Sequence, residues 1–117
     1  MDIVNTQVLN QLAEDISPQD LRIVVQTFES DLHRLGGALT ASAAAGDLVA
    51  FRRSAHAIAG AAGAVGATAI EHAARRAMQV ADQDAARATA DAAGLIGLAG
   101  ETITALRRMV ERVSRPA

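Results

Sequence analysis

Aromatic side chains are almost absent from this chain, and their absence limits what its core can be built from. Aromatic residues make up 2% of the sequence, as Phe28 and Phe51, while 50% of the residues are hydrophobic. The core must therefore consist of Leu, Ile, Val, Met and many alanines. Alanine is the best helix former, whereas strands favour aromatic and β-branched residues. The composition predicts an all-α protein.

Apolar residues recur at helical spacing between recognisable start and stop signals. Ser17 and Pro18 are typical of an N-cap followed by the first helical position. Gly46 and Asp47 are typical of a C-cap followed by the next N-cap, and Gly66 of a second C-cap. The expected helices cover residues 5–15, 18–45, 48–65, 68–81 and 85–112.

Three local motifs refine these expectations. Gly36-Gly37 is expected to interrupt or bend the second helix. The run Thr68-Ala69-Ile70-Glu71 predicts a capping box that opens the fourth helix. Arg115-Pro116 is expected to end the last one. Short loops between long amphipathic helices predict a single domain over residues 1–117, an antiparallel up-and-down four-helix bundle with a short additional N-terminal helix.

Charge and residue usage exclude several classes of function. The formal net charge of −2 and the pI near 5.8 argue against nucleic acid as the main partner. The absence of cysteine excludes disulfides and thiolate sites. No apolar run approaches the roughly 20 residues of a membrane span. We expect a cytoplasmic protein without a membrane partner.

The titratable residues that could carry chemistry are three histidines, His33, His56 and His72. There is no Gly-rich phosphate loop after a strand and no H-E-x-x-H motif. On its own helix, His56 lies roughly 140° from the centre of the apolar stripe, and His33 is about as far from its stripe. Helical geometry places all three histidines away from the core, so exposure does not choose between them.

The sequence around each histidine differs in charge. Glu29 lies one turn before His33 and Asp31 is close to it in sequence, so the local negative charge disfavours an incoming anion. Arg52 and Arg53 precede His56 by one turn, and the side chains that follow it are small, at Ala59, Gly60 and Gly63. A histidine that a phosphorylated partner must approach closely benefits from cations on one side and from glycine or alanine on the other, where no large side chain obstructs the partner. His56 is the predicted site, with Ala59, Gly60 and Gly63 giving the partner access.

The run from His56 to Ala67 resembles the signature of the histidine-containing phosphotransfer (HPt) domain family of two-component phosphorelays. In that signature a histidine, an apolar residue, a lysine and a glycine precede small residues and a Gly-terminated helix. The run Ala45-Gly46-Asp47-Leu48 and the position of Phe28 also fit. The similarity covers residues 17–81, and the last helix fits by position.

The chain departs from the family pattern at two positions. The lysine expected three residues after the histidine is Ala59 here, and every basic residue of the chain is an arginine. The resemblance implies that this lysine holds phosphoryl oxygens. The candidate substitutes are Arg52, Arg53, Arg75 and Arg76. The family's polar residue that orients the imidazole would fall near Met78 or Gln79, of which only Gln79 could serve.

The resemblance also implies the reaction and the partners. A receiver domain of a response regulator would supply an aspartyl phosphate and its Mg²⁺, and His56 would accept the phosphoryl group and pass it to another receiver aspartate. The expected partners are the receivers of a hybrid histidine kinase and of a downstream regulator. This chain is expected to hold no cofactor or metal of its own and to be a monomer.

Other classes of protein fit less well. A dimerising histidine kinase domain would place an acidic residue directly after the histidine, where this chain has Ala57. A metal enzyme would need convergent ligands, but the three histidines belong to three different helices. A helical adaptor that binds receiver or kinase domains without phosphotransfer is the alternative that stays open.

Overall fold

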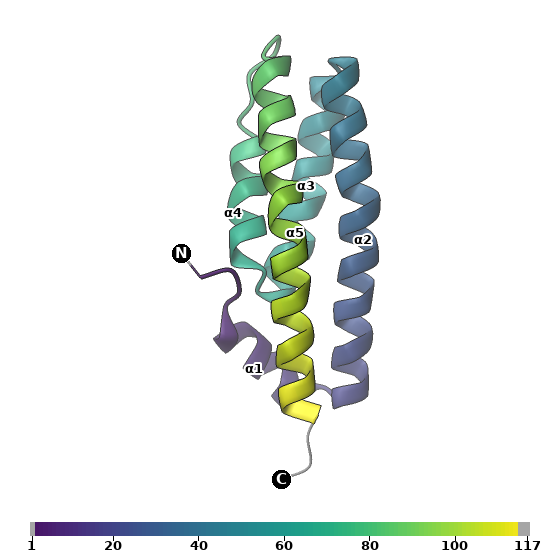
Figure 1. Cartoon of the computed structure of the whole chain (residues 1–117), viewed down its shortest axis with the longest axis vertical. Helices are drawn as coiled ribbons and strands as arrows, with labels where there is room; N and C mark the ends of the chain where they lie inside the picture. Colours follow the sequence, from purple (N-terminus) through teal and green to yellow (C-terminus); the bar gives the residue numbers. More distant parts are fainter. Residues whose placement is uncertain (1, 115–117) are drawn as a thin grey trace.

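A computed structural model of the chain describes residues 2–114, in which every regular element is an α-helix (Figure 1). The all-α prediction is confirmed. The predicted stop at Arg115-Pro116 lies outside the described residues. The helices are α1 (Thr6–Asp15), α2 (Pro18–Ala45), α3 (Leu48–Val65), α4 (Thr68–Ala77) and α5 (Ala85–Ser114).

Helices α2 to α5 lie side by side along the long axis of the molecule (Figure 1). Helix α2 packs against α3 and α5, and α4 packs against the same two helices. The short α1 lies at the end of the molecule where α5 finishes (Figure 1). Backbone hydrogen bonds from Asn5 N to Gly66 O (2.7 Å) and from Ala69 N to Ile3 O (3.3 Å) attach the segment around α1 to the turn after α3 and to the first turn of α4.

The core between these helices is aliphatic, as the composition requires. Phe28 and Phe51 are both buried in it. The other large apolar side chains that are fully buried come from all parts of the chain, namely Leu9, Leu21, Leu39, Ile58, Ile70, Val80, Leu95 and Leu106. Buried alanines fill the space between them and let the helices approach closely.

Most of the predicted helix ends are confirmed. The hydroxyl of Ser17 accepts a hydrogen bond from Asp20 N (3.0 Å), and Pro18 is the first residue of α2. The carboxylate of Asp47 accepts one from Ala50 N (3.1 Å) at the start of α3. Gly46 and Gly66, with φ of 70° and 73°, end α2 and α3 in the left-handed conformation that favours glycine.

Two local predictions are wrong. Gly36-Gly37 does not interrupt α2, because buried Leu32 and Leu39 pack on either side of the pair and tertiary packing outweighs the low helix propensity of glycine. The run from Thr68 to Glu71 is not a capping box, since the N-cap of α4 is Ala67 and makes no side-chain hydrogen bond. The hydroxyl of Thr68 donates instead to Gly66 O (3.3 Å).

The ends of the last two helices also differ from the prediction. Helix α4 stops at Ala77 rather than near Ala81, and Val80, beyond its end, is buried in the core. The polar run that follows forms the expected turn, in which Gln83 has a φ of 75°. Helix α5 continues to Ser114. Within residues 2–114, no helix has both the length and the apolar character needed to cross a membrane.

Candidate functional site

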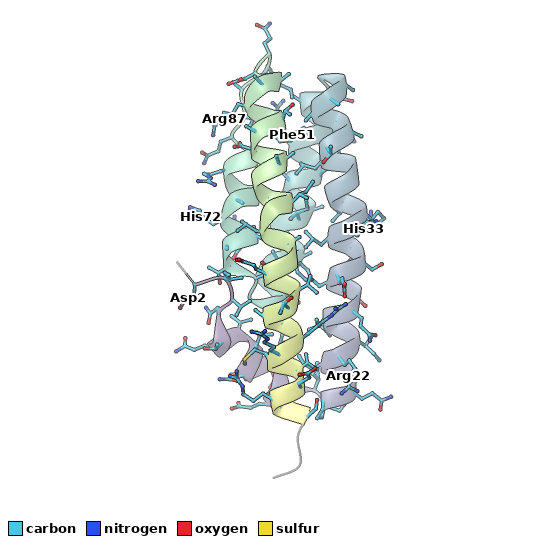
Figure 2. All side chains as sticks on the ribbon, viewed as in Figure 1. Asp2, Arg22, His33, Phe51, His72 and Arg87 are labelled. Carbon is cyan, nitrogen blue, oxygen red and sulfur yellow. The ribbon has the colours of Figure 1, made fainter. Side chains whose placement is uncertain are left out.

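His56 lies exposed in the middle of α3, as predicted. The helix buries Phe51, Ala55, Ile58 and Ala62 against the core. His56 falls outside that stripe, so its imidazole is accessible from solvent. His33 and His72 are exposed as well, so exposure does not distinguish the three (Figure 2).

A second stripe of α3 passes through His56 and faces α4. It consists of Arg52, His56, Ala59 and Gly63, whose spacing of three and four residues aligns them along one side of the helix. Both ends of this stripe contact α4 or the loop that follows it. His56 therefore lies on the edge of α3 that borders α4.

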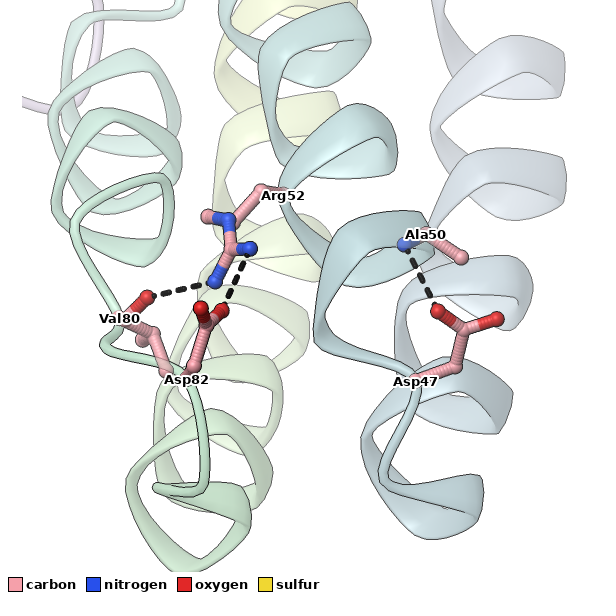
Figure 3. Close-up of polar contacts among 5 residues, drawn as sticks. All are labelled: Asp47, Ala50, Arg52, Val80 and Asp82. Carbon is pink, nitrogen blue, oxygen red and sulfur yellow. Dashed lines mark hydrogen bonds and ion pairs between the residues drawn. The ribbon is translucent and has the colours of Figure 1, made fainter.

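At one end of the stripe, the guanidinium of Arg52 bridges to the loop between α4 and α5 (Figure 3). It donates to Val80 O at 3.0 Å and to the Asp82 carboxylate at 2.8 Å. The Arg52 side chain is 29% exposed, whereas that of Asp82 is 80% exposed. Arg52 is thus already bound to two acceptors of its own chain.

At the other end of the stripe, the carboxylate of Glu71 lies over Gly63. A Cβ atom on Gly63 would come within 3.0 Å of Glu71 Oε2. The same oxygen accepts a hydrogen bond from Arg75 at 2.9 Å. The missing side chain of Gly63 therefore makes room for a carboxylate of this chain rather than for a partner.

These two contacts set an antiparallel register between α3 and α4. Counting along both helices from Arg52 and from Gly63 brings Met78 level with His56 and Arg75 level with Ala59. Met78 is partly buried and packs on the core. Gln79 is exposed in the turn after α4, and its side chain makes no hydrogen bond to His56 in the described structure. The role predicted for Gln79 gains no support from this geometry.

The three residues predicted to give a partner access differ in how far α4 covers them. Ala59 is 3% exposed, because α4 covers this side of α3. Gly63 is occupied by Glu71, as described above. Gly60 is exposed, and a Cβ atom there would meet nothing within 4 Å. Open access next to His56 is therefore found at Gly60, and the expectation for Ala59 and Gly63 is corrected.

The arginines predicted to stabilise a phosphoryl group occupy different positions. Arg53 is exposed and lies one turn before His56, on the solvent-facing side of α3 that also carries Gly60. Arg75 lies on the α3-facing edge of α4, and its side chain is 63% exposed. Arg76 is exposed on a different side of α4, one turn after His72. Neither Arg53 nor Arg76 forms an ion pair among residues 2–114.

His33 lies in a different environment, on the rim of an apolar groove of about 840 Å³ between α2 and α5. Glu29, one turn before it, pairs with Arg107 at 2.6 Å. This pairing weakens the electrostatic argument against His33, which the sequence alone could not show. Within the described residues, no group of three or more His, Asp and Glu side chains could hold a metal ion.

The fold and the site together define an all-helical protein with an exposed histidine, His56. Arg52 and Arg53 lie one turn before this histidine, and the exposed Gly60 lies one turn after it. Comparison with protein families identifies the protein further. The family model described as Hpt domain matches residues 19–115, so α1 lies outside the match. The chain belongs to the Hpt domain family. No curated protein and no solved structure gave a match.

Proposed function

We propose that this chain is the phosphoryl carrier of a phosphorelay. His56 accepts a phosphoryl group from the aspartyl phosphate of a receiver domain and passes it to the aspartate of another receiver. The observation that carries this proposal is the exposure of His56 on α3, at the start of the run that resembles the family's histidine signature. Membership of the Hpt domain family supports the reaction class.

In the proposed reaction this chain supplies the nucleophile, and the receiver domain supplies the phosphoryl group. A ring nitrogen of the neutral imidazole attacks phosphorus, the N–P bond forms, and the O–P bond of the aspartyl phosphate breaks to release the carboxylate. Positioning and the cancellation of charge on the transferring group provide most of the catalysis. In this proposal the receiver supplies Mg²⁺.

The scaffold accounts for the way in which His56 is presented. In this proposal α2 to α5 form an antiparallel up-and-down four-helix bundle, and α3 is held firmly by Phe51 and Ile58 in the core. A rigid helix fixes the position of the imidazole, and Gly60 leaves space beside it. A monomer in the cytoplasm could meet two receivers in turn at this one site.

The direct test is phosphoryl transfer from a phosphorylated receiver. Wild-type chain should acquire phosphate that is labile in acid and stable in base, as expected for an N–P bond. His56→Gln should acquire none, whereas His33→Gln and His72→Gln should match the wild type. Equal labelling of wild type and His56→Gln would refute the assignment.

The alternative function is an adaptor that binds receiver or kinase domains without phosphotransfer. The observation in its favour is the apolar surroundings of His56 toward α4, where Ala59 and Met78 stand at the two positions at which the resemblance expects polar residues. An adaptor would bind a receiver in sedimentation or calorimetry and yet carry no label after incubation with its phosphorylated form.

A further inference from the structure

We propose that Arg75 is the phosphoryl-binding cation of this site, and that it leaves Glu71 to contact the phosphoryl group when His56 is phosphorylated. The inference rests on the proposed function, which it deepens. It assigns the charge near the imidazole to α4 instead of α3. It also gives Glu71 a role as the resting partner of that charge.

The α4-facing edge of α3 has no unpaired cation within one turn of His56 to bind a phosphoryl group. The residue one turn beyond His56 is Ala59, which is buried and carries no charge. Arg52, one turn before His56, donates to Val80 O and to Asp82. Recruiting Arg52 would break two hydrogen bonds that join α3 to the loop after α4. A transferring phosphoryl group nevertheless needs charge-assisted hydrogen bonds to its oxygens.

Helix α4 brings a cation to the same edge. Glu71, Arg75 and Met78 follow one another at helical spacing, and Glu71 lies against Gly63 of α3. This stripe of α4 therefore faces the stripe of α3 that contains His56. Arg75 lies level with Ala59, where it can supply the charge that the alanine does not. Arg76 is the next residue and belongs to another side of the helix.

The contact that holds Arg75 at present is one that a phosphoryl group can replace. Arg75 and Glu71 form an i, i+4 ion pair whose side chains are 63% and 30% exposed. Pairs of this kind on a helix surface are weak, because water screens both charges. A phosphoryl group carries more negative charge than a carboxylate and offers several acceptor oxygens to the planar guanidinium.

Gly63 contributes by allowing Glu71 to occupy its resting position. Any larger residue there would push the Glu71 carboxylate away, since even a Cβ atom would lie 3.0 Å from Oε2. Arg75 is therefore held within one turn of the site while His56 is unmodified. Phosphorylation would exchange one anion for another at the guanidinium without moving a helix.

The experiment uses the full chain and phosphoramidate, a small donor that needs no receiver. The imidazole attacks phosphorus, the P–N bond of phosphoramidate breaks, and ammonia leaves. Arg75→Ala should take up phosphate on His56 about tenfold more slowly than wild type, and Arg75→Lys should recover part of the rate. Arg76→Ala is the matched control and should keep the wild-type rate.

A second control separates binding of the phosphoryl group from structural support. Glu71→Gln weakens the same ion pair as Arg75→Ala but leaves the cation in place, so its rate should be at least that of the wild type. In ¹⁵N NMR spectra, the Arg75 Nε–H signal should shift when His56 is phosphorylated, and the Arg76 signal should stay in place.

The outcomes distinguish this inference from the proposed function. If wild-type chain takes up no phosphate from either donor, the proposed function fails and the inference falls with it. If wild type is phosphorylated on His56 but Arg75→Ala matches Arg76→Ala, the carrier function stands and the role of Arg75 is refuted. A Glu71→Gln variant as slow as Arg75→Ala would also refute the role of Arg75. Loss of the ion pair between Glu71 and Arg75 would then be enough to explain the slow phosphorylation of both variants.

Discussion

Arg52 and Asp82 form an ion pair of 2.8 Å that joins α3 to the loop between α4 and α5 (Figure 3). The same guanidinium donates to the backbone oxygen of Val80, which is buried in the core. Two acceptors on one short segment hold the end of α4 against α3. Met78 and Gln79 precede this segment directly, so Arg52 also holds in place the part of the chain that lies level with His56.

This arrangement predicts that Arg52 contributes to stability, not only to charge. Arg52→Ala removes a partly buried hydrogen bond and an exposed ion pair, so it should lower the free energy of unfolding by about 1–2 kcal/mol. Asp82→Ala removes the exposed pair alone and should cost less than about 1 kcal/mol. Urea unfolding followed by circular dichroism measures both. Arg53→Ala is the control, and a loss equal to that of Arg52→Ala would contradict the prediction.

The two glycines that follow His56 should respond differently to alanine. Gly60 lies in a helix with open space around its Cα, so Gly60→Ala should stabilise the protein by up to about 1 kcal/mol. Gly63→Ala gains the same helix propensity but must displace the carboxylate of Glu71. Its net stabilisation should therefore be smaller.

Thermal unfolding of the two variants, each also made with Glu71→Ala, tests that explanation. With Glu71 truncated, nothing described opposes a Cβ atom at Gly63, and the gains from Gly60→Ala and Gly63→Ala should converge. A difference that persists without the Glu71 carboxylate would show that another group restricts Gly63.

The sequence predicted the fold well wherever the signals are local. Ser17, Gly46, Asp47 and Gly66 cap their helices as expected, because each cap depends on a side chain or a φ angle within one turn. The capping box at Thr68 failed because the chain had already become helical there, after the left-handed Gly66. Helix ends set by tertiary packing, such as the end of α4, have no such local signal.

The candidate site was predicted only in part for the same reason. The exposure of His56 follows from the periodicity of its own helix. The burial of Ala59 and the occupation of Gly63 depend on which edge of α3 meets α4, and on the register between them. A single sequence contains no direct information on that register. The i, i+4 spacing of Glu71 and Arg75 was visible, but their position beside Gly63 was not.

The two left-handed glycines predict a contrast at the ends of α2 and α3. Gly46 has a φ of 70° with open space around it, so Gly46→Ala should cost about 1–2 kcal/mol from backbone strain. Gly66 has a similar φ of 73°, but a Cβ atom there would meet Asn5 O at 2.9 Å. Gly66→Ala should therefore cost more in urea unfolding.

Gly66→Ala should also loosen the N-terminal segment, since Gly66 O accepts the hydrogen bond from Asn5 N that attaches it. Hydrogen exchange resolved by residue should show faster exchange in α1 for this variant and not for Gly46→Ala. Equal exchange in the two variants would mean that α1 is attached mainly by its apolar contacts, such as those of Leu9.

The space at Gly60 predicts a difference between large and small phosphoryl donors. A receiver domain must bring its aspartyl phosphate within bonding distance of His56, and Gly60 lies one turn away on the open side. Gly60→Gln places a long side chain in that approach, so transfer from a phosphorylated receiver should slow several-fold. Uptake from phosphoramidate should remain close to the wild-type rate, because a small donor can pass the new side chain. Gly97→Gln, at an exposed glycine of α5 with similar open space, should leave both rates unchanged. If Gly60→Gln slows both donors equally, it disturbs the imidazole itself, and if it slows neither, the receiver approaches His56 from another direction.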